Sequence, residues 1–161
     1  MPFLKEFYEK VAFFLATGFF LSLYVPFAPG TLGSLPFMVL VVGLSQMPVF
    51  LQIASSLLLA LLAVPVCTAA EKRFGIKDDG RIVADEWMLL PISFIGLPLQ
   101  DIPLWMILLM FAVVRCNDIL KPFPCRGLQK FPGGFGIVID DFFANIYSLA
   151  VNWAIYLCFI R

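Results

Sequence analysis

Long apolar stretches alternate with short polar ones along this 161-residue chain. Residues 35–70 carry almost no charge and are too many for one membrane-crossing helix, so Ser-Gln-Met-Pro at 45–48 predicts a turn between two helices. A second apolar stretch, 87–114, is broken in the same way by Pro98-Leu-Gln-Asp101, and a mostly apolar run of 19 residues closes the chain. The pattern predicts helices near 35–45, 49–70, 86–97, 102–119 and 142–160.

These helices predict an all-α integral membrane protein, a bundle of about four to five membrane helices with its polar motif loops gathered on one face. We expect a single helical membrane domain over residues 1–161. Its predicted segments are an amphipathic helix with a Gly/Pro loop (1–34), a helical hairpin (35–70), a polar loop (71–86), a second hairpin (87–119), a second polar loop (120–141) and a final span (142–160).

The positive charges indicate which way this bundle faces. Two hairpins and one final span place residues 1–34, 71–86 and 115–141 on the same side of the membrane. Ten of the eleven Lys and Arg residues fall in these segments, and only Arg161 lies across. The positive-inside rule therefore predicts that this face is cytoplasmic.

Composition narrows the class of protein further. Hydrophobic residues make up 61% of the chain and charged residues 14%, whereas a soluble domain has about 25% charged residues. The net charge of zero argues against a general nucleic-acid binder, because neutralising phosphates requires an excess of Lys and Arg. The chain has no histidine, which excludes Ser-His-Asp and Cys-His nucleophiles and histidine-ligated zinc. Four scattered cysteines are typical of small apolar residues in a reducing compartment.

Three clusters on the predicted cytoplasmic face combine carboxylates with cations. A carboxylate at a helix end can simply terminate a span, and Asp140 alone could be an N-cap. Three such clusters on one face instead favour a functional site, because ionisable groups beside a bilayer are costly. Oxygen ligands without histidine or thiolate favour Mg²⁺, and the nearby cations suggest a phosphate ligand. The clusters are Asp78-Asp79-Gly-Arg81-Ile-Val-Ala-Asp85-Glu86, Arg115-Cys-Asn117-Asp118-Ile-Leu-Lys121-Pro122-Phe-Pro124 and Gly133-Gly-Phe-Gly-Ile-Val-Ile-Asp140-Asp141.

A fourth segment, Ala28-Pro-Gly30-Thr31-Leu-Gly-Ser34-Leu35, is uncharged. Its glycines, hydroxyls and free backbone N–H groups ahead of a helix are typical of an anion site, although Pro-Gly also marks an ordinary turn.

Taken together, these motifs resemble the phosphatidylglycerophosphatase A family of bacterial membrane phosphatases. The matching stretches occur in the family's order between about residues 12 and 147, beginning with Leu15-Ala-Thr17-Gly18. The chain departs from the family pattern at Trp87, Asn117 and Asn145, which affects packing more than the carboxylates. The resemblance implies Mg²⁺-dependent hydrolysis of phosphatidylglycerophosphate to phosphatidylglycerol, within phospholipid biosynthesis, at the cytoplasmic face of the bacterial inner membrane.

The hypothesis assigns roles to ten residues. Glu86 or Asp140 would act catalytically by orienting the attacking water, and a covalent aspartyl-phosphate ranks lower because no Asp-x-Asp motif is present. The proposed ligands of one or two Mg²⁺ ions are Asp85, Glu86, Asp118, Asp140 and Asp141, and the proposed substrate contacts are Thr31, Ser34, Arg81, Arg115 and Lys121.

Three alternatives remain open. A different lipid phosphate, such as phosphatidate or a prenyl diphosphate, would require the same chemistry. A small transporter predicts acids in mid-span and an internal repeat. A non-catalytic membrane scaffold predicts no Mg²⁺ binding. The oligomeric state leaves no mark in the sequence.

Overall fold

The computed structural model describes residues 2–25 and 27–159, and this part of the chain contains helices and no strands. The predicted end of the last helix, Ile160, and the cation Arg161 lie outside the described residues. The helices are α1 (Pro2–Ala16), α2 (Leu21–Tyr24), α3 (Pro29–Ser34), η1 (Leu35–Phe37), α4 (Met38–Ser45), α5 (Val49–Phe74), α6 (Ala84–Leu89), η2 (Leu90–Phe94), η3 (Leu99–Asp101), α7 (Leu104–Leu120), α8 (Cys125–Leu128) and α9 (Gly133–Phe159).

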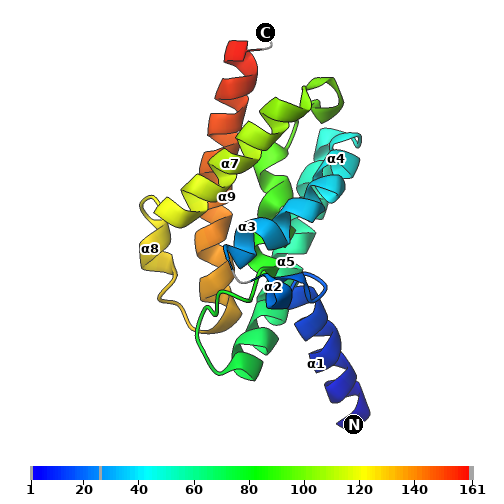
Figure 1. Ribbon diagram of the computed structural model, residues 1–161, viewed down its shortest axis with the longest axis vertical. Coiled ribbons are helices and arrows are strands. Elements are labelled where there is room, and N and C mark those ends of the chain that lie inside the picture. The colour runs from blue at the N-terminus through cyan, green and yellow to red at the C-terminus, as the bar shows by residue number, and fades with distance from the viewer. Residues whose placement is uncertain (1, 26, 160–161) are drawn as a thin grey trace.

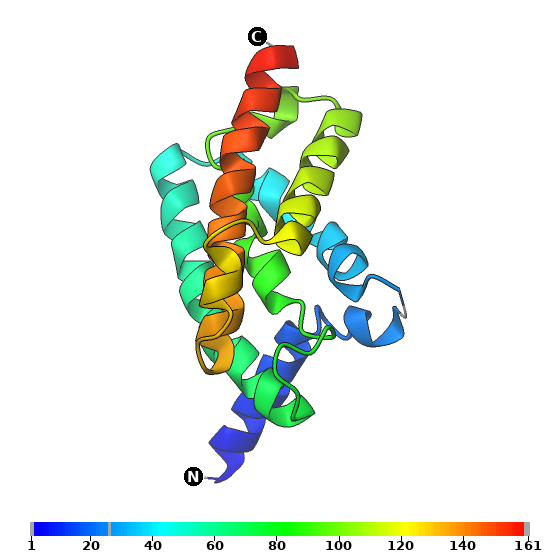
Figure 2. The same ribbon diagram turned by 90° about the vertical axis from the view of Figure 1, so that its left-hand side faces the viewer.

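Two long helices, α5 and α9, form the frame on which the other elements pack. They lie side by side, and α7 packs along the opposite flank of α9 (Figures 1 and 2). Helix α1 lies at the lower end of Figure 1, whereas the C-terminal end of α9 lies at the upper end. The first turn of α6, the last turns of α7 and the third turn of α9 meet in the middle of the molecule (Figure 1).

Helix α5 begins and ends where local chemistry predicts. Pro48 precedes its first turn, and Gly75 ends it in the left-handed conformation with φ +70°. Lys72 and Arg73 in the last turn face the negative end of the helix dipole. The helix extends four residues beyond the predicted end at residue 70.

Both α5 and α9 are long and apolar enough to cross a membrane. Only 28% of the most apolar window of α5 and 22% of that of α9 are buried inside the protein. Large apolar side chains such as Leu61 on α5 and Leu157 on α9 are consequently left exposed on the outside. An exposed apolar surface of this extent marks a face that contacts lipid or another apolar partner.

The last helix differs most from its predicted boundaries. It begins at Gly133 rather than at residue 142, so the second half of the expected polar loop 120–141 is helical. Gly-Gly is typical of a loop, but here Gly134 allows the α9 backbone to approach α5. A Cβ at Gly134 would clash with the Val64 carbonyl oxygen and the Thr68 amide nitrogen. Asp140 and Asp141 therefore lie about two turns inside α9.

Two shorter segments also differ from the expectation. Residues 29–34, predicted as a Gly/Pro loop, form helix α3, with Pro29 at its first position. The helix expected over 86–97 is instead α6 followed by the 3-10 turn η2, because Pro91 has no N–H to continue an α-helix.

Candidate active site

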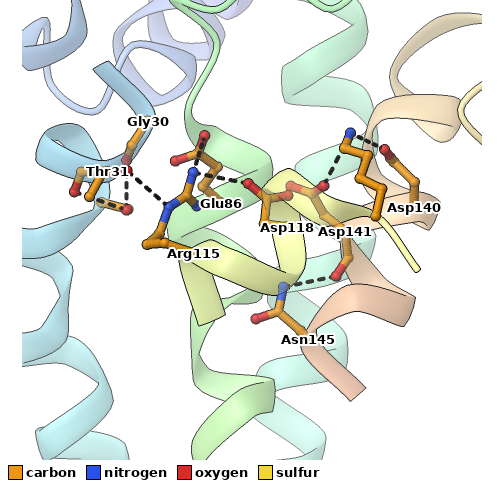
Figure 3. A network of polar contacts seen from close by, with 10 residues as sticks. Gly30, Thr31, Glu86, Arg115, Asp118, Asp140, Asp141 and Asn145 are labelled. Carbon is orange, nitrogen blue, oxygen red and sulfur yellow. Dashed lines mark hydrogen bonds and ion pairs between the residues drawn. The ribbon is translucent and has the colours of Figure 1, made fainter. Parts of the chain in front are cut away.

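Arg115 is the centre of a buried polar network formed by three helices (Figure 3). Its Nη2 donates to Glu86 Oε1 and to Asp118 Oδ2, each at 2.9 Å. Its Nε donates to Thr31 Oγ1 at 3.3 Å. Because Arg115 is only 8% exposed, these contacts with α3, α6 and its own helix α7 provide its charge compensation.

A second cation, Lys121, follows directly after α7. It adopts a left-handed conformation with φ 44°, and this turns the chain toward α9. Its Nζ contacts Asp140 and lies 3.8 Å from Asp141 Oδ1. Burial lowers the pKa of Lys121, but the Asp141 and Asp140 carboxylates outweigh that effect and raise it above the usual value. Lys121 is therefore protonated at any physiological pH.

Between the two cations, the carboxylates of Asp118 and Asp141 point toward one another (Figure 3). Carboxylates that face each other in a buried place repel unless a proton or a cation lies nearby. The site therefore concentrates negative charge between α7 and α9.

Three carboxylate oxygens in this region are buried without a hydrogen-bond partner: Asp85 Oδ1, Glu86 Oε2 and Asp140 Oδ1. Burial raises the pKa of Asp85 well above its usual value, and the neighbouring Glu86 adds to that shift. Burial also raises the pKa of Glu86, to about 7, although Arg115 opposes the change. An unpartnered buried carboxylate oxygen is costly, which marks a place prepared for a proton or a cation.

Five carboxylates face two cations in this cluster, which leaves three negative charges uncompensated when all are ionised. Such an excess of oxygen donors fits a hard divalent cation such as Mg²⁺. As the side chains are placed, no three carboxylates among the described residues gather into a metal-binding group, because Arg115 and Lys121 stand between them. The carboxylates are Asp85, Glu86, Asp118, Asp140 and Asp141.

Helix α3 closes the side of the site opposite α9. Gly30 lies so near Glu86 that a Cβ there would clash with the Glu86 carboxylate. Thr31 presents its hydroxyl to Arg115, as expected of a polar contact in the site. Ser34 is fully buried, and its hydroxyl donates instead to the Gly30 carbonyl oxygen at 2.7 Å.

Arg81, a predicted substrate contact, is placed outside this network. Its Nε and Nη2 donate to the two oxygens of Asp79 at 2.8 and 2.7 Å, and its guanidinium lies 4.1 Å from the Phe74 ring centroid. The hydrogen bond from Arg81 holds the pKa of Asp79 below its usual value. Of the five predicted substrate contacts, Thr31, Arg115 and Lys121 are those that join the network.

Sequence reasoning missed a polar support beneath the carboxylates. Asn145 donates to the Asp141 carbonyl oxygen at 2.8 Å and accepts from the Ser93 hydroxyl at 2.6 Å. Asn152, about two turns after Asn145 in α9, donates to the Ser93 carbonyl oxygen at 3.0 Å. These bonds tie α9 to η2, and the position of Asn145 four residues after Asp141 is the only signal of them in the sequence.

Comparison with known proteins identifies one family and three relatives named as lipid phosphatases. Residues 14–156 match the family model described as phosphatidylglycerophosphatase A. A phosphatidylglycerophosphatase A of Haemophilus influenzae is 41% identical over 144 residues, covering 88% of this chain and 86% of that protein. The Escherichia coli protein of the same name is 34% identical, covering 88% of this chain and 81% of its own length. A Bacteroides thetaiotaomicron protein, named provisionally as a phosphatidylinositol-3-phosphatase, is 33% identical, covering 83% of this chain and 86% of that protein. No solved structure matches the chain.

Proposed function

The chain belongs to the phosphatidylglycerophosphatase A family, and we propose that the network around Arg115 is where it hydrolyses phosphatidylglycerophosphate to phosphatidylglycerol and phosphate. One observation supports this location above all. The two cations of the site, buried Arg115 and half-buried Lys121, lie beside carboxylates that have unpartnered oxygens. Phosphate monoester hydrolysis needs both positive charge for the phosphate and negative oxygens for a metal ion or a water.

The cations bind and orient the phosphate. The planar guanidinium of Arg115 suits two phosphate oxygens at once, and the ammonium of Lys121 adds a point charge. Both cations now hold carboxylates, so the incoming phosphate replaces part of those ion pairs. The Thr31 hydroxyl, 3.3 Å from Arg115 Nε, keeps the guanidinium directed toward α3.

We propose that Asp85, Glu86, Asp118, Asp140 and Asp141 hold Mg²⁺. The unpartnered buried oxygens Asp85 Oδ1 and Asp140 Oδ1 support this set, since they gain a partner when a cation binds. Bound Mg²⁺ would neutralise phosphate charge and lower the pKa of a coordinated water.

Glu86 is the better placed of the two proposed bases. Its Oε2 is buried and free, and burial brings its pKa to about 7, where a carboxylate accepts and returns a proton efficiently. Asp140, by contrast, is paired with Lys121. In the hydrolysis, water oxygen bonds to phosphorus, the glycerol oxygen leaves, and the proton taken by Glu86 is available to that leaving oxygen.

The location follows from the two apolar helices and the charge pattern. We propose that α5 and α9 cross the bacterial inner membrane and that the site opens toward the cytoplasm. The diacyl tails of the substrate then stay in the bilayer while the phosphate reaches Arg115. Phosphatidylglycerophosphate and membrane lipids are thus the proposed partners.

Phosphate release by the detergent-purified protein tests the proposal. We expect release from phosphatidylglycerophosphate with Mg²⁺, loss of release with EDTA, and slower release from phosphatidate and phosphatidylinositol 3-phosphate. Faster release from phosphatidate or phosphatidylinositol 3-phosphate would identify that lipid as the substrate in place of phosphatidylglycerophosphate. The proposed location of the site would not change. Release unaffected by EDTA would contradict the proposed metal.

A single substitution tests the site itself. Asp141→Asn should reduce kcat by at least about 100-fold, the scale of losing one transition-state interaction of several kcal/mol. Asp101→Asn, at an exposed position in η3, is the matched control and should keep wild-type activity. Substantial turnover by a folded Asp141→Asn variant would contradict the assignment of Asp141.

A further inference from the structure

A cavity of about 800 Å³ lies between α1 and α5, and its lining includes none of the active-site network residues. Three cations line it, Lys5 from α1 and Lys72 and Arg73 from α5, against one carboxylate, Glu9. The cavity therefore has a surplus of positive charge that the protein does not compensate within it. A ligand that fits it by charge is an anion.

Contacts between the two helices give the cavity its shape. The Tyr8 hydroxyl donates to the Pro65 carbonyl oxygen at 2.9 Å, which ties α1 across α5. The Arg73 guanidinium lies 3.9 Å from the centroid of the Phe13 ring, which holds it against α1. The cations are thus presented on a wall of two packed helices.

An apolar groove continues from this cavity along α5. It has a volume of about 310 Å³ and runs between α5 and α9, which lie side by side in Figure 2. Val64 lines both hollows, and the other groove residues, such as Leu57, Leu61 and Phe135, are all apolar. The cations lie toward the C-terminal end of α5 and the groove toward its middle. One ligand that fills both hollows has an anionic head and a long apolar chain.

We propose that this surface binds an anionic phospholipid of the cytoplasmic leaflet. The lipid phosphate lies among Lys5, Lys72 and Arg73, and one acyl chain lies in the groove between α5 and α9. The surplus of positive charge favours a lipid with net negative charge over a zwitterionic one, whose headgroup has no net charge.

The site also adjoins α9, the helix that carries Asp140 and Asp141. Thr68 lines the cavity, and its Oγ1 accepts the Gly134 N–H at 3.0 Å. A lipid held there contacts the seam at which α9 begins on α5.

Native mass spectrometry of the detergent-purified protein tests the proposal with equal amounts of dioleoyl phosphatidylserine and dioleoyl phosphatidylcholine. Phosphatidylserine is a phosphodiester and carries no terminal phosphate, so its binding is separate from the proposed reaction. We expect phosphatidylserine adducts to predominate. The double variant Lys72→Gln/Arg73→Gln should weaken phosphatidylserine binding up to about 30-fold, because each basic residue near an anionic lipid contributes about a factor of five.

The control variant Lys10→Gln/Lys130→Gln removes the same charge at two exposed positions outside the cavity and should keep the adducts. Equal adducts of both lipids, an equal loss in the control, or a dimer in place of the lipid adduct would each overturn the proposal. If circular dichroism shows that the double variant is unfolded, the single variant Lys5→Gln on exposed α1 takes its place. It should weaken phosphatidylserine binding about fivefold, and unchanged binding would overturn the proposal.

Discussion

Gly30 is the point at which the backbone of α3 meets the Glu86 carboxylate. A Cβ at this position would clash with the carboxylate, which is the mobile end of a flexible side chain and can move aside. Gly30→Ala should therefore leave the fold intact but break the Glu86–Arg115 pair. Because a hydrogen bond to a charged group contributes about 1.5–3 kcal/mol, we expect kcat/KM to fall about 10- to 100-fold.

Gly43→Ala is the matched control for this change. Gly43 lies within α4, and a Cβ there meets no atom within 4 Å. Alanine should raise the melting temperature slightly, since glycine in a helix is about 0.5–1 kcal/mol less favourable, and activity should not change. Wild-type kcat/KM in Gly30→Ala would show that Glu86 has no role that depends on its position.

Replacing Arg115 by lysine tests whether the site requires the geometry of the guanidinium or only its positive charge. Lysine keeps the charge but cannot contact Thr31, Glu86 and Asp118 together, because an ammonium lacks the fork of the guanidinium. Arg115→Lys should lower kcat/KM by about 10- to 100-fold, on the scale of one or two lost charged hydrogen bonds.

The same exchange at an exposed cation provides the comparison. Arg126 is exposed and, among the described residues, donates only to the Leu120 carbonyl oxygen, so Arg126→Lys should retain nearly full activity. If both variants kept wild-type kcat/KM in phosphate-release assays, a bidentate role for Arg115 would be wrong.

At the level of the elements, the seam between α5 and α9 determines where the carboxylates of α9 lie. A Cβ at Gly134 would clash with backbone atoms of Val64 and Thr68, which cannot move without shifting a helix. Gly134→Ala should destabilise the protein by about 1–3 kcal/mol, the usual cost of overpacking, and lower its melting temperature in detergent. Gly127→Ala in α8, where a Cβ has open space, should be neutral; an equal effect of both would contradict the close approach.

This seam also explains why the sequence predicted the presence of the helices better than the residues at which they begin and end. Apolar runs identify α5 and α7 within a few residues, because the exposed and the buried positions of these helices are both mostly apolar. Gly133-Gly134 has two opposite uses, a loop or a close helix contact, and only the neighbouring helix decides between them. The pattern alone therefore started α9 nine residues too late.

In the candidate site too, the sequence predicts some features and not others. Residues at helix ends with paired charges, such as Glu86, Arg115 and Asp118, stand out in an apolar chain, and the structure brings them together. Ser93 and Asn145 lie far apart in the sequence, and their contact depends on how η2 packs on α9. Arg81 is equally conspicuous in the sequence, but its side chain pairs with Asp79, two residues away, and not with the network around Arg115.

At the scale of the whole molecule, the distribution of positive charge and the two apolar helices favour one orientation in the membrane. All ten Lys and Arg residues between positions 2 and 159 fall in the segments 1–34, 71–86 and 115–141. The α4–α5 turn and the C-terminal end of α9 carry none of them. A bundle inserted with the proposed site toward the cytoplasm satisfies the positive-inside rule, whereas the opposite orientation would translocate all ten charges.

Cysteine labelling in intact cells tests this orientation. The two exposed cysteines, Cys116 and Cys158, are first replaced by alanine, and the buried pair Cys67 and Cys125 is kept. Met47→Cys, in the exposed α4–α5 turn, should then react with a membrane-impermeant maleimide in spheroplasts.

Ile76→Cys, exposed after α5, should react only after the membrane is opened. Both positions are solvent-accessible in the fold, so a difference between them reports the membrane and not local burial. The reverse pattern would place Arg115 and its carboxylates outside the cell. It would also place the ten cations of segments 1–34, 71–86 and 115–141 outside, against the positive-inside rule, which is why we expect the labelling to favour the cytoplasmic orientation.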